Sequence, residues 1–261
     1  MAFTDSHAHL DDARFEEDRA AVLERARQAG VERILAIASG ITASECERTL
    51  RLAAEHDFLW AAVGLHPHEA RHASEELLTA LARLAENPRV LAWGEIGLDY
   101  HYDHSPREVQ QAVFRQQLQQ ARALKLPVII HCREAWDDGL RILEDDWAAS
   151  GLGGILHCFS GDTEVARRAH EWGFLISFAG NATFPRADNL RAAARAVPLE
   201  ALLIETDCPY LAPQSVRGRR NEPAFVVEVA ATLAGLHGVS REEMGARTSE
   251  NFLRLFPRAR A

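Results

Sequence analysis

Short apolar runs alternate with longer amphipathic stretches along this chain, and the alternation limits the folds it can adopt. Most of the runs are four to eight residues long and rich in β-branched or aromatic residues, as is typical of strands buried on both faces. They cover residues 2–5, 33–38, 59–65, 90–96, 128–130, 154–156, 174–177 and 202–204. Eight strands alternating with helices predict an α/β fold, a parallel (β/α)8 TIM barrel with its active site at the carboxyl ends of the strands. A doubly wound open sheet is the alternative, because the pattern does not show closure.

The stretches between these runs have helical spacing. They cover residues 15–28, 44–56, 74–86, 106–124, 135–149, 163–172 and 188–196, and two more helices, 223–236 and 241–255, follow the last run. Ser44, three residues before Glu47, and Ser74, which precedes acidic residues, are the expected helix caps. The pair Ser105 and Pro106 fits a cap followed by a first-turn proline.

Composition narrows the class of protein further. The 38 Asp and Glu residues outnumber the 29 Lys and Arg residues, so the net charge of -9 argues against non-specific nucleic-acid binding through a basic surface. No apolar stretch approaches the roughly 18 residues of a spanning helix, and the first residues lack a signal-peptide pattern. The four cysteines show no CxxC pairing, which fits a reducing compartment. We therefore expect a cytoplasmic protein with no membrane partner and no obligate protein partner, folded as a single domain over residues 1–261.

Side chains that bind metals recur at the predicted carboxyl ends of the strands. His7 and His9 follow the first run, and their spacing places both on one face of an extended strand. The full set of candidate metal ligands is His7, His9, Glu95, His131, His157 and Asp207. One HxH pair is a weak signal, but six imidazole and carboxylate groups at one rim predict a binuclear metal site.

The two carboxylates of this set have different expected roles. Glu95 is the natural bridge between two metal ions, because a carboxylate has two oxygens. Two divalent ions roughly 3.5–4 Å apart lower the pKa of a shared water and hold an oxygen of the substrate. Asp207 is expected to hold a metal and to accept the proton of the attacking water. Glu95 and Asp207 are therefore the predicted catalytic residues.

Arginines near the same rim are candidates for contacts with an anionic substrate. Arg133 directly follows His131 and is expected to project over the rim, where its guanidinium group can bind a phosphate. The basic run 217–220 follows the eighth strand, where barrels often bind phosphate. Within this run, Arg219 is the candidate contact for the substrate. A solvated surface run is the alternative for these arginines.

Side chains alternate between the two faces of a strand, and this alternation predicts which way the residues next to the candidate ligands point. Glu205 has the same parity as Asp207, so it either faces the site, where it would contact substrate, or forms a buried pair with an arginine. Cys132 and Cys158 each follow a ligand by one residue and are expected to face the surrounding helices as small apolar side chains.

Motifs at these positions resemble those of the TatD family of metal-dependent nucleases. They are DSHAHL (5–10), GLHPH (64–68), GEIGLDY (94–100), PVIIHCREA (127–135), HCFSG (157–161), ETDCPYL (205–211) and RRNEP (219–223). They occur in the family's order, so the resemblance covers nearly the whole chain. It implies a TIM barrel that hydrolyses phosphodiester bonds of DNA with divalent metal ions, held by the six ligands named above. It also implies that His66 contacts the substrate or its phosphate.

The expected reaction is in-line hydrolysis of a phosphodiester at two divalent ions. The resemblance favours Mg, whereas four histidine ligands would also suit Mn or Zn. A shallow rim suits single-stranded or frayed ends of DNA better than an intact duplex. A 3′-5′ exonuclease is therefore predicted, with RNA as a second candidate substrate.

Two other functions stay open. An amidohydrolase-type lactonase, esterase or amidase also begins with HxH and can have a Glu-bridged binuclear site. The amidohydrolases whose two metal ions are bridged by a carboxylated lysine are excluded. The only lysine, Lys125, precedes the fifth strand and is expected at the opposite end of the barrel. A non-enzymatic metal-binding or nucleic-acid-binding protein would need a positive groove and exposed aromatic residues, which the net charge of -9 disfavours.

Overall fold

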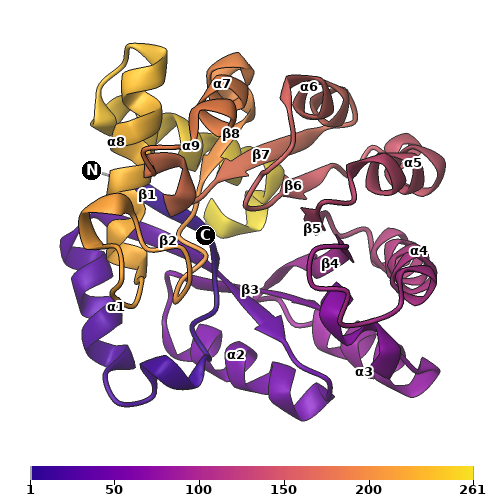
Figure 1. Cartoon of the computed structure of the whole chain (residues 1–261). Helices are drawn as coiled ribbons and strands as arrows, with labels where there is room; N and C mark the ends of the chain where they lie inside the picture. Colours follow the sequence, from indigo (N-terminus) through magenta and orange to yellow (C-terminus); the bar gives the residue numbers. More distant parts are fainter. Residues whose placement is uncertain (1, 261) are drawn as a thin grey trace.

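The computed structural model describes residues 2–260, apart from the side chain of Ser39, and contains one sheet of eight parallel strands. The strands follow one another around a nearly closed ring in chain order, and the helices lie outside it (Figure 1). Their bounds are β1 (Phe3–Ala8), β2 (Val31–Ser39), β3 (Leu59–Gly64), β4 (Val90–Asp99), β5 (Val128–Arg133), β6 (Gly154–Leu156), β7 (Phe174–Phe178) and β8 (Leu202–Ile204). The predicted TIM barrel is confirmed.

Helices fill the crossovers between successive strands. They are α1 (Arg19–Gln28), α2 (Ala43–Glu55), α3 (Glu75–Ala85), α4 (Arg107–Leu124), α5 (Trp136–Asp146), α6 (Thr163–Glu171), α7 (Asp188–Ala196), α8 (Val226–His237) and α9 (Arg241–Leu255). Within residues 2–260, no single helix is both long and apolar enough to cross a membrane; the pair Pro223–His237 and Arg241–Leu255, bent by 103°, meets those criteria only when its two members are combined.

The ring closes between β1 and the segment that follows β8. Ala8 and Cys208 form an isolated parallel bridge. The backbone N–H of Asp207 donates to the carbonyl of His7 at 2.9 Å, and the N–H of His9 donates to the carbonyl of Cys208 at 2.8 Å. The same backbone hydrogen bonds therefore close the barrel and place His7, His9 and Asp207 beside one another.

The barrel interior is a separate apolar core from the layer between strands and helices. Inward-facing side chains such as Leu35, Trp60 and Ile129 form one buried cluster with Phe252 and Phe256 from the end of α9. Figure 1 shows this C-terminal segment in yellow at the centre of the ring of strands. The amino-terminal end of the barrel is thus filled with apolar side chains, whereas the carboxyl-terminal end carries the polar groups described below.

Several elements begin or end at other residues than the sequence predicts. β1, β4 and β5 extend to Ala8, Asp99 and Arg133, so that His7 and His131 lie inside strands and not directly after them. Helix α2 is capped by Thr42, which forms a capping box with Glu45, and not by Ser44. Ser74 caps α3 as predicted, since it accepts a hydrogen bond from the N–H of Leu77.

The predicted cap at Ser105 is wrong. Pro106 itself occupies the capping position of α4, and no side chain caps that helix. The hydroxyl of Ser105 instead donates to the carbonyl of His68 at 2.7 Å and accepts from the N–H of Arg71. It therefore ties the loop after β3 to the loop after β4.

Gly97 lies on β4 midway between Glu95 and Asp99, and it allows β4 to pass close to β5. It pairs with His131, and its φ of 138° lies where side chains are rarely tolerated. A Cβ atom at this position would stand 2.0 Å from the carbonyl oxygen of His131. A glycine is therefore required for the contact between the two strands.

Replacing Gly97 by alanine is expected to lower the free energy of unfolding by roughly 1–3 kcal/mol, because the methyl group forces the backbone of β5 away. Urea denaturation followed by circular dichroism measures the loss. Gly235→Ala is the matched control: no atom lies within 4 Å of an added Cβ on α8, so stability should stay equal or rise by about 0.5–1 kcal/mol. Equal stability of wild type and Gly97→Ala would contradict the prediction.

Candidate metal centre

Glu95 lies at the centre of the carboxyl-terminal end of the barrel, with only 2% of its side chain exposed. Its Oε1 atom is 2.9 Å from Nδ1 of His131, 2.8 Å from Nε2 of His157 and 3.3 Å from Nε2 of His66. Three strands or strand ends thus direct an imidazole nitrogen at one carboxylate oxygen. The predicted ligands His131 and His157 are brought together here, and His66 joins them.

The second oxygen of Glu95 faces a different group. Its Oε2 atom is 3.2 Å from Nε2 of His7 and 3.8 Å from Nε2 of His9. The carboxylate of Asp207 completes this group, with Oδ1 at 3.3 Å from the His9 nitrogen and 3.8 Å from the His7 nitrogen. The other five predicted metal ligands therefore form two groups, one at each oxygen of the buried Glu95 carboxylate.

This donor set fits a pair of divalent cations. Oε2 of Glu95 is buried and has no hydrogen-bond partner within residues 2–260, although ring nitrogens of His7 and His9 point towards it. A buried carboxylate oxygen without a donor is costly unless a cation meets it. Imidazole nitrogens and carboxylate oxygens are ligands that Zn, Mn and related ions accept. His7, His9, Asp207 and Glu95 would hold one ion, and His131, His157 and Glu95 the other.

The charges of these groups respond strongly to one another. Burial raises the pKa of Glu95, but the neighbouring imidazoles, His157 foremost, hold it well below its usual value. Burial lowers the pKa of His157, but the carboxylates of Glu95 and Glu205 outweigh it and raise this pKa well above the ordinary value. Burial lowers the pKa of His66 to about 4, so His66 is neutral at pH 7. Protons thus occupy positions that a divalent cation would take, and metal binding would release them.

Two further carboxylates hold the far sides of the histidine rings. Nε2 of His131 lies 3.0 Å from Oδ2 of Asp99, and Nδ1 of His157 lies 3.2 Å from Oε1 of Glu205. Each ring therefore has one nitrogen at Glu95 and the other at an acid, an arrangement that fixes its orientation and raises its basicity as a ligand.

Asp99 has no predicted role in the sequence, although it shares the parity of Glu95 on β4. It is buried and also accepts hydrogen bonds from the backbone N–H groups of His101 and Tyr102, and its Oδ2 lies 2.9 Å from Nε2 of His68. These contacts join the loops after β3 and β4 to the centre. The sequence does contain a signal for Asp99: positions 95 and 99 of an extended strand point to the same face, so Asp99 could have been expected beside Glu95.

Glu205 is completely buried, and its surroundings differ both from a substrate contact and from a buried pair with an arginine. Its Oε1 accepts the backbone N–H of Cys158 at 2.6 Å as well as facing His157. Within residues 2–260, Glu205 does not line the cavity and forms no ion pair with an arginine. It supports the ring of His157 from behind.

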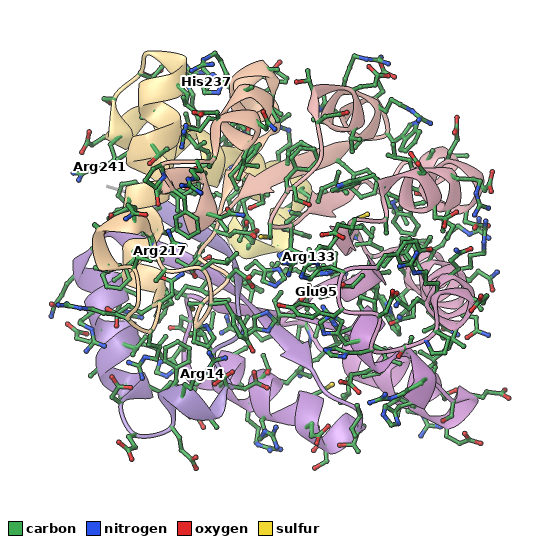
Figure 2. All side chains as sticks on the ribbon, viewed as in Figure 1. Arg14, Glu95, Arg133, Arg217, His237 and Arg241 are labelled. Atoms are coloured by element: carbon green, nitrogen blue, oxygen red, sulfur yellow. The ribbon has the colours of Figure 1, made fainter. Side chains whose placement is uncertain are left out.

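A cavity of about 810 Å3 lies over the centre at the carboxyl ends of the strands. Arg133 lines it, and its guanidinium carbon lies 4.9 Å from the centre of the Tyr102 ring. Figure 2 shows Arg133 beside Glu95 near the middle of the ring. Arg219, by contrast, is exposed on the loop after β8 and is not among the described residues that line this cavity.

The two cysteines after the ligands differ from each other. Cys132 is buried, and its sulfur would meet a Cβ on Gly139 of α5 at 3.0 Å, as expected of a side chain facing a helix. Both cysteines are among the residues that line the cavity, but the prediction for Cys158 is wrong, because this residue has a φ of 42° and is partly exposed. β6 ends at Leu156, so strand parity no longer applies at residue 158.

Removing the carboxylates behind the histidines is expected to weaken metal binding. Asp99→Asn and Glu205→Gln should each lower the affinity for a divalent ion roughly 10- to 100-fold, because the ring loses its orienting acid. Titration calorimetry on metal-stripped protein measures the change. Asp138→Asn is the control, since it removes a carboxylate bonded to the Tyr100 hydroxyl outside the centre. An Asp99→Asn protein that binds metal as tightly as the control would refute this role.

Comparison with known proteins identifies the family. The model of the TatD related DNase family matches residues 4–257. An uncharacterized metal-dependent hydrolase of Bacillus subtilis (strain 168), YabD, is 42% identical over 97% of this chain and 98% of its own length. A protein of Erwinia tasmaniensis named 3′-5′ ssDNA/RNA exonuclease TatD is 38% identical over 97% of this chain and 98% of its own length.

A solved structure agrees with these sequence relatives. The crystal structure of YJJV, a TatD homolog from Escherichia coli K12, superposes with a TM-score of 0.91 and 35% sequence identity, and covers 98% of each chain. The resemblance seen in the seven sequence motifs is thereby confirmed. This chain belongs to the TatD related DNase family.

Proposed function

We propose that this TatD-family metal-dependent hydrolase cleaves phosphodiester bonds of DNA and removes nucleotides in the 3′-5′ direction from single-stranded or frayed ends, with RNA as a second substrate. The observation that carries the proposal is the position of Glu95, whose two oxygens each face a separate group of candidate ligands. The relatives named 3′-5′ ssDNA/RNA exonuclease support the polarity and the preference for single strands. Other relatives, at 42% identity, carry only the name of metal-dependent hydrolase.

The metal ions supply two kinds of chemistry when bound: they lower the pKa of a coordinated water, and they neutralise charge on the phosphate. We propose two ions, with Mg as the physiological metal and Mn or Zn as substitutes. Glu95 would be a ligand of both ions, since its two oxygens face the two groups of candidate ligands. Asp99 and Glu205 hold the rings of His131 and His157 in the orientation required for binding.

Asp207 is the proposed general base. It lies at the edge of the cavity with 14% of its side chain exposed, so a water molecule can reach it. Burial raises the pKa of Asp207, but hydrogen bonding to His9 and the charges of nearby imidazoles lower it below the usual value. The ionised carboxylate takes one proton of the attacking water as the new P–O bond forms and the bond from phosphorus to the sugar oxygen breaks, and the departing sugar oxygen takes up a proton from solvent water to become a hydroxyl.

Arg133 and His66 are the proposed contacts for the substrate phosphate. Arg133 forms no ion pair within the described residues and lies at the cavity, where its charge can offset the negative charge that builds up in the transition state. His66 is neutral at pH 7 because of its lowered pKa, and its ring lines the same cavity. A neutral imidazole can donate one hydrogen bond to a phosphate oxygen.

The reaction is tested with metal-stripped protein and single-stranded oligonucleotides labelled at the 3′ or the 5′ end. Mg, Mn and Zn are added back separately, and an oligonucleotide with a blocked 3′ end is included. We expect metal-restored cleavage that releases the 3′ label first and is slow on the blocked strand. Equal digestion of free and blocked 3′ ends would contradict the exonuclease proposal.

Two variants connect this activity to the centre. Glu95→Ala should abolish metal-dependent cleavage, and Asp207→Asn should lower kcat roughly 10²- to 10⁴-fold, which is the usual contribution of a general base. Glu250→Gln, which removes an exposed acid on α9, is the control and should keep full activity. A filled metal site without cleavage of any nucleic acid would favour a Glu-bridged lactonase, esterase or amidase, and those substrates would then be screened.

A further inference from the structure

A second hollow of about 570 Å3 adjoins the cavity over the metal centre. Ser160 and Asn181 line both spaces, so the two are continuous. The floor and sides of the second space come from residues 184–187, 189 and 190, which precede and begin α7, and from Arg217 in the loop after β8. We call this space the basic groove.

Among the described residues, the basic groove carries arginines without ion pairs and is lined by no acidic side chain. Arg186 and Arg217 are both exposed, and within residues 2–260 neither forms an ion pair. Neighbouring arginines are paired, since Arg191 meets Asp188 and Arg220 meets Asp18. None of the described residues that line the groove is Asp or Glu. In a chain with a net charge of -9, this local excess of cations selects an anionic ligand.

Aromatic and apolar side chains accompany these charges. The guanidinium carbon of Arg217 lies 4.4 Å from the centre of the Phe184 ring, a contact that holds the charge at the edge of the groove. Leu190 lines the same space. Cationic groups that follow a phosphate backbone, combined with flat or apolar surfaces for bases, are the usual features of a single-strand binding groove.

Hydrogen bonds fix the segments that form the basic groove. Arg191 donates to the backbone carbonyls of Ala182, Phe184 and Pro185, which fixes the segment before α7. The N–H of Gln214 donates to the hydroxyl of Thr183 at 2.8 Å, which joins the loop after β8 to the loop after β7. Arg186 and Arg217 are therefore presented on a preformed surface, and binding a strand requires little ordering of the protein.

We propose that the basic groove is a subsite for the nucleotides on the 5′ side of the scissile phosphate, with Arg186 and Arg217 at successive phosphates and a base against Phe184. This inference rests on the proposed function, because it takes the strand to be held at its 3′ end over the metal centre. Figure 2 shows Arg217 on the opposite side of Glu95 from the α5 region, which gives the direction in which the strand leaves the centre.

The double variant Arg186→Gln/Arg217→Gln tests the subsite. Its kcat/KM for dT10 should fall roughly tenfold through KM, whereas hydrolysis of the small substrate thymidine 5′-(4-nitrophenyl phosphate) should change less than about twofold, since that substrate does not reach the groove. The slope of log(kcat/KM) against log[salt] should become shallower by about 1.4, which is roughly 0.7 for each of two single-strand phosphate contacts. An unchanged KM and an unchanged slope for dT10 would overturn the subsite.

The matched control is Arg241→Gln/Arg247→Gln on α9, which also removes two positive charges, neither of them among the described residues that line the groove. It should behave as wild type with both substrates. An equal loss in both double variants would show that only net charge matters, and it would overturn the proposal. Circular dichroism melts verify that all variants are folded.

A binding measurement separates failure of the subsite from failure of the nuclease proposal. Fluorescence anisotropy follows binding of a 5′-fluorescein phosphorothioate dT10, which resists hydrolysis, to the Mg-loaded protein. Weaker binding by Arg186→Gln/Arg217→Gln, at least about fivefold, supports the groove even if wild type cleaves no DNA. Equal binding by wild type and this variant refutes the groove even if wild type is an active nuclease.

Discussion

The closure of the barrel between its first and last strands is the constraint on which the site depends. Backbone hydrogen bonds join His7 and His9 to the segment at Asp207 and Cys208. Because backbone donors and acceptors fix the distance between two segments to within a narrow range, the backbone itself brings His7, His9 and Asp207 close enough for their side chains to contact one another. Stability of the fold and geometry of the centre therefore share the same few bonds.

Opposite charges alternate outward from Glu95. Imidazoles surround its two oxygens, and a second layer of carboxylates, Asp99 and Glu205, lies behind two of these rings. A buried group of this kind is stable only when each charge meets its opposite. In the metal-free protein, protons raise the charge of the imidazoles, as the raised pKa values of His131 and His157 indicate. Divalent cations would provide that positive charge at all pH values where the carboxylates are ionised.

Alternation along strands predicts much of the fold and of the centre, and its failures have physical causes. The ligands on the long strands β1 and β4 follow parity, so HxH and Glu95 could be assigned from sequence. β6 and β8 are each only three residues long, so Cys158 and Glu205 lie beyond them, where the backbone turns and parity carries no information. The start of α2 is ambiguous for another reason: Thr42 with Glu45 and Ser44 with Glu47 have the same capping spacing, and only the backbone conformation selects the first pair.

The aromatic side chains that fill the amino-terminal end of the barrel have a consequence for biosynthesis. Phe252 and Phe256 complete the inner core, and β1 gains its second neighbour only at Cys208. During translation, the early strands therefore expose an open sheet edge and an unfilled interior until the last part of the described chain has left the ribosome. Cooperative folding of the barrel must therefore wait for residues up to Phe256, and shorter nascent chains present the surfaces that chaperones bind and proteases recognise.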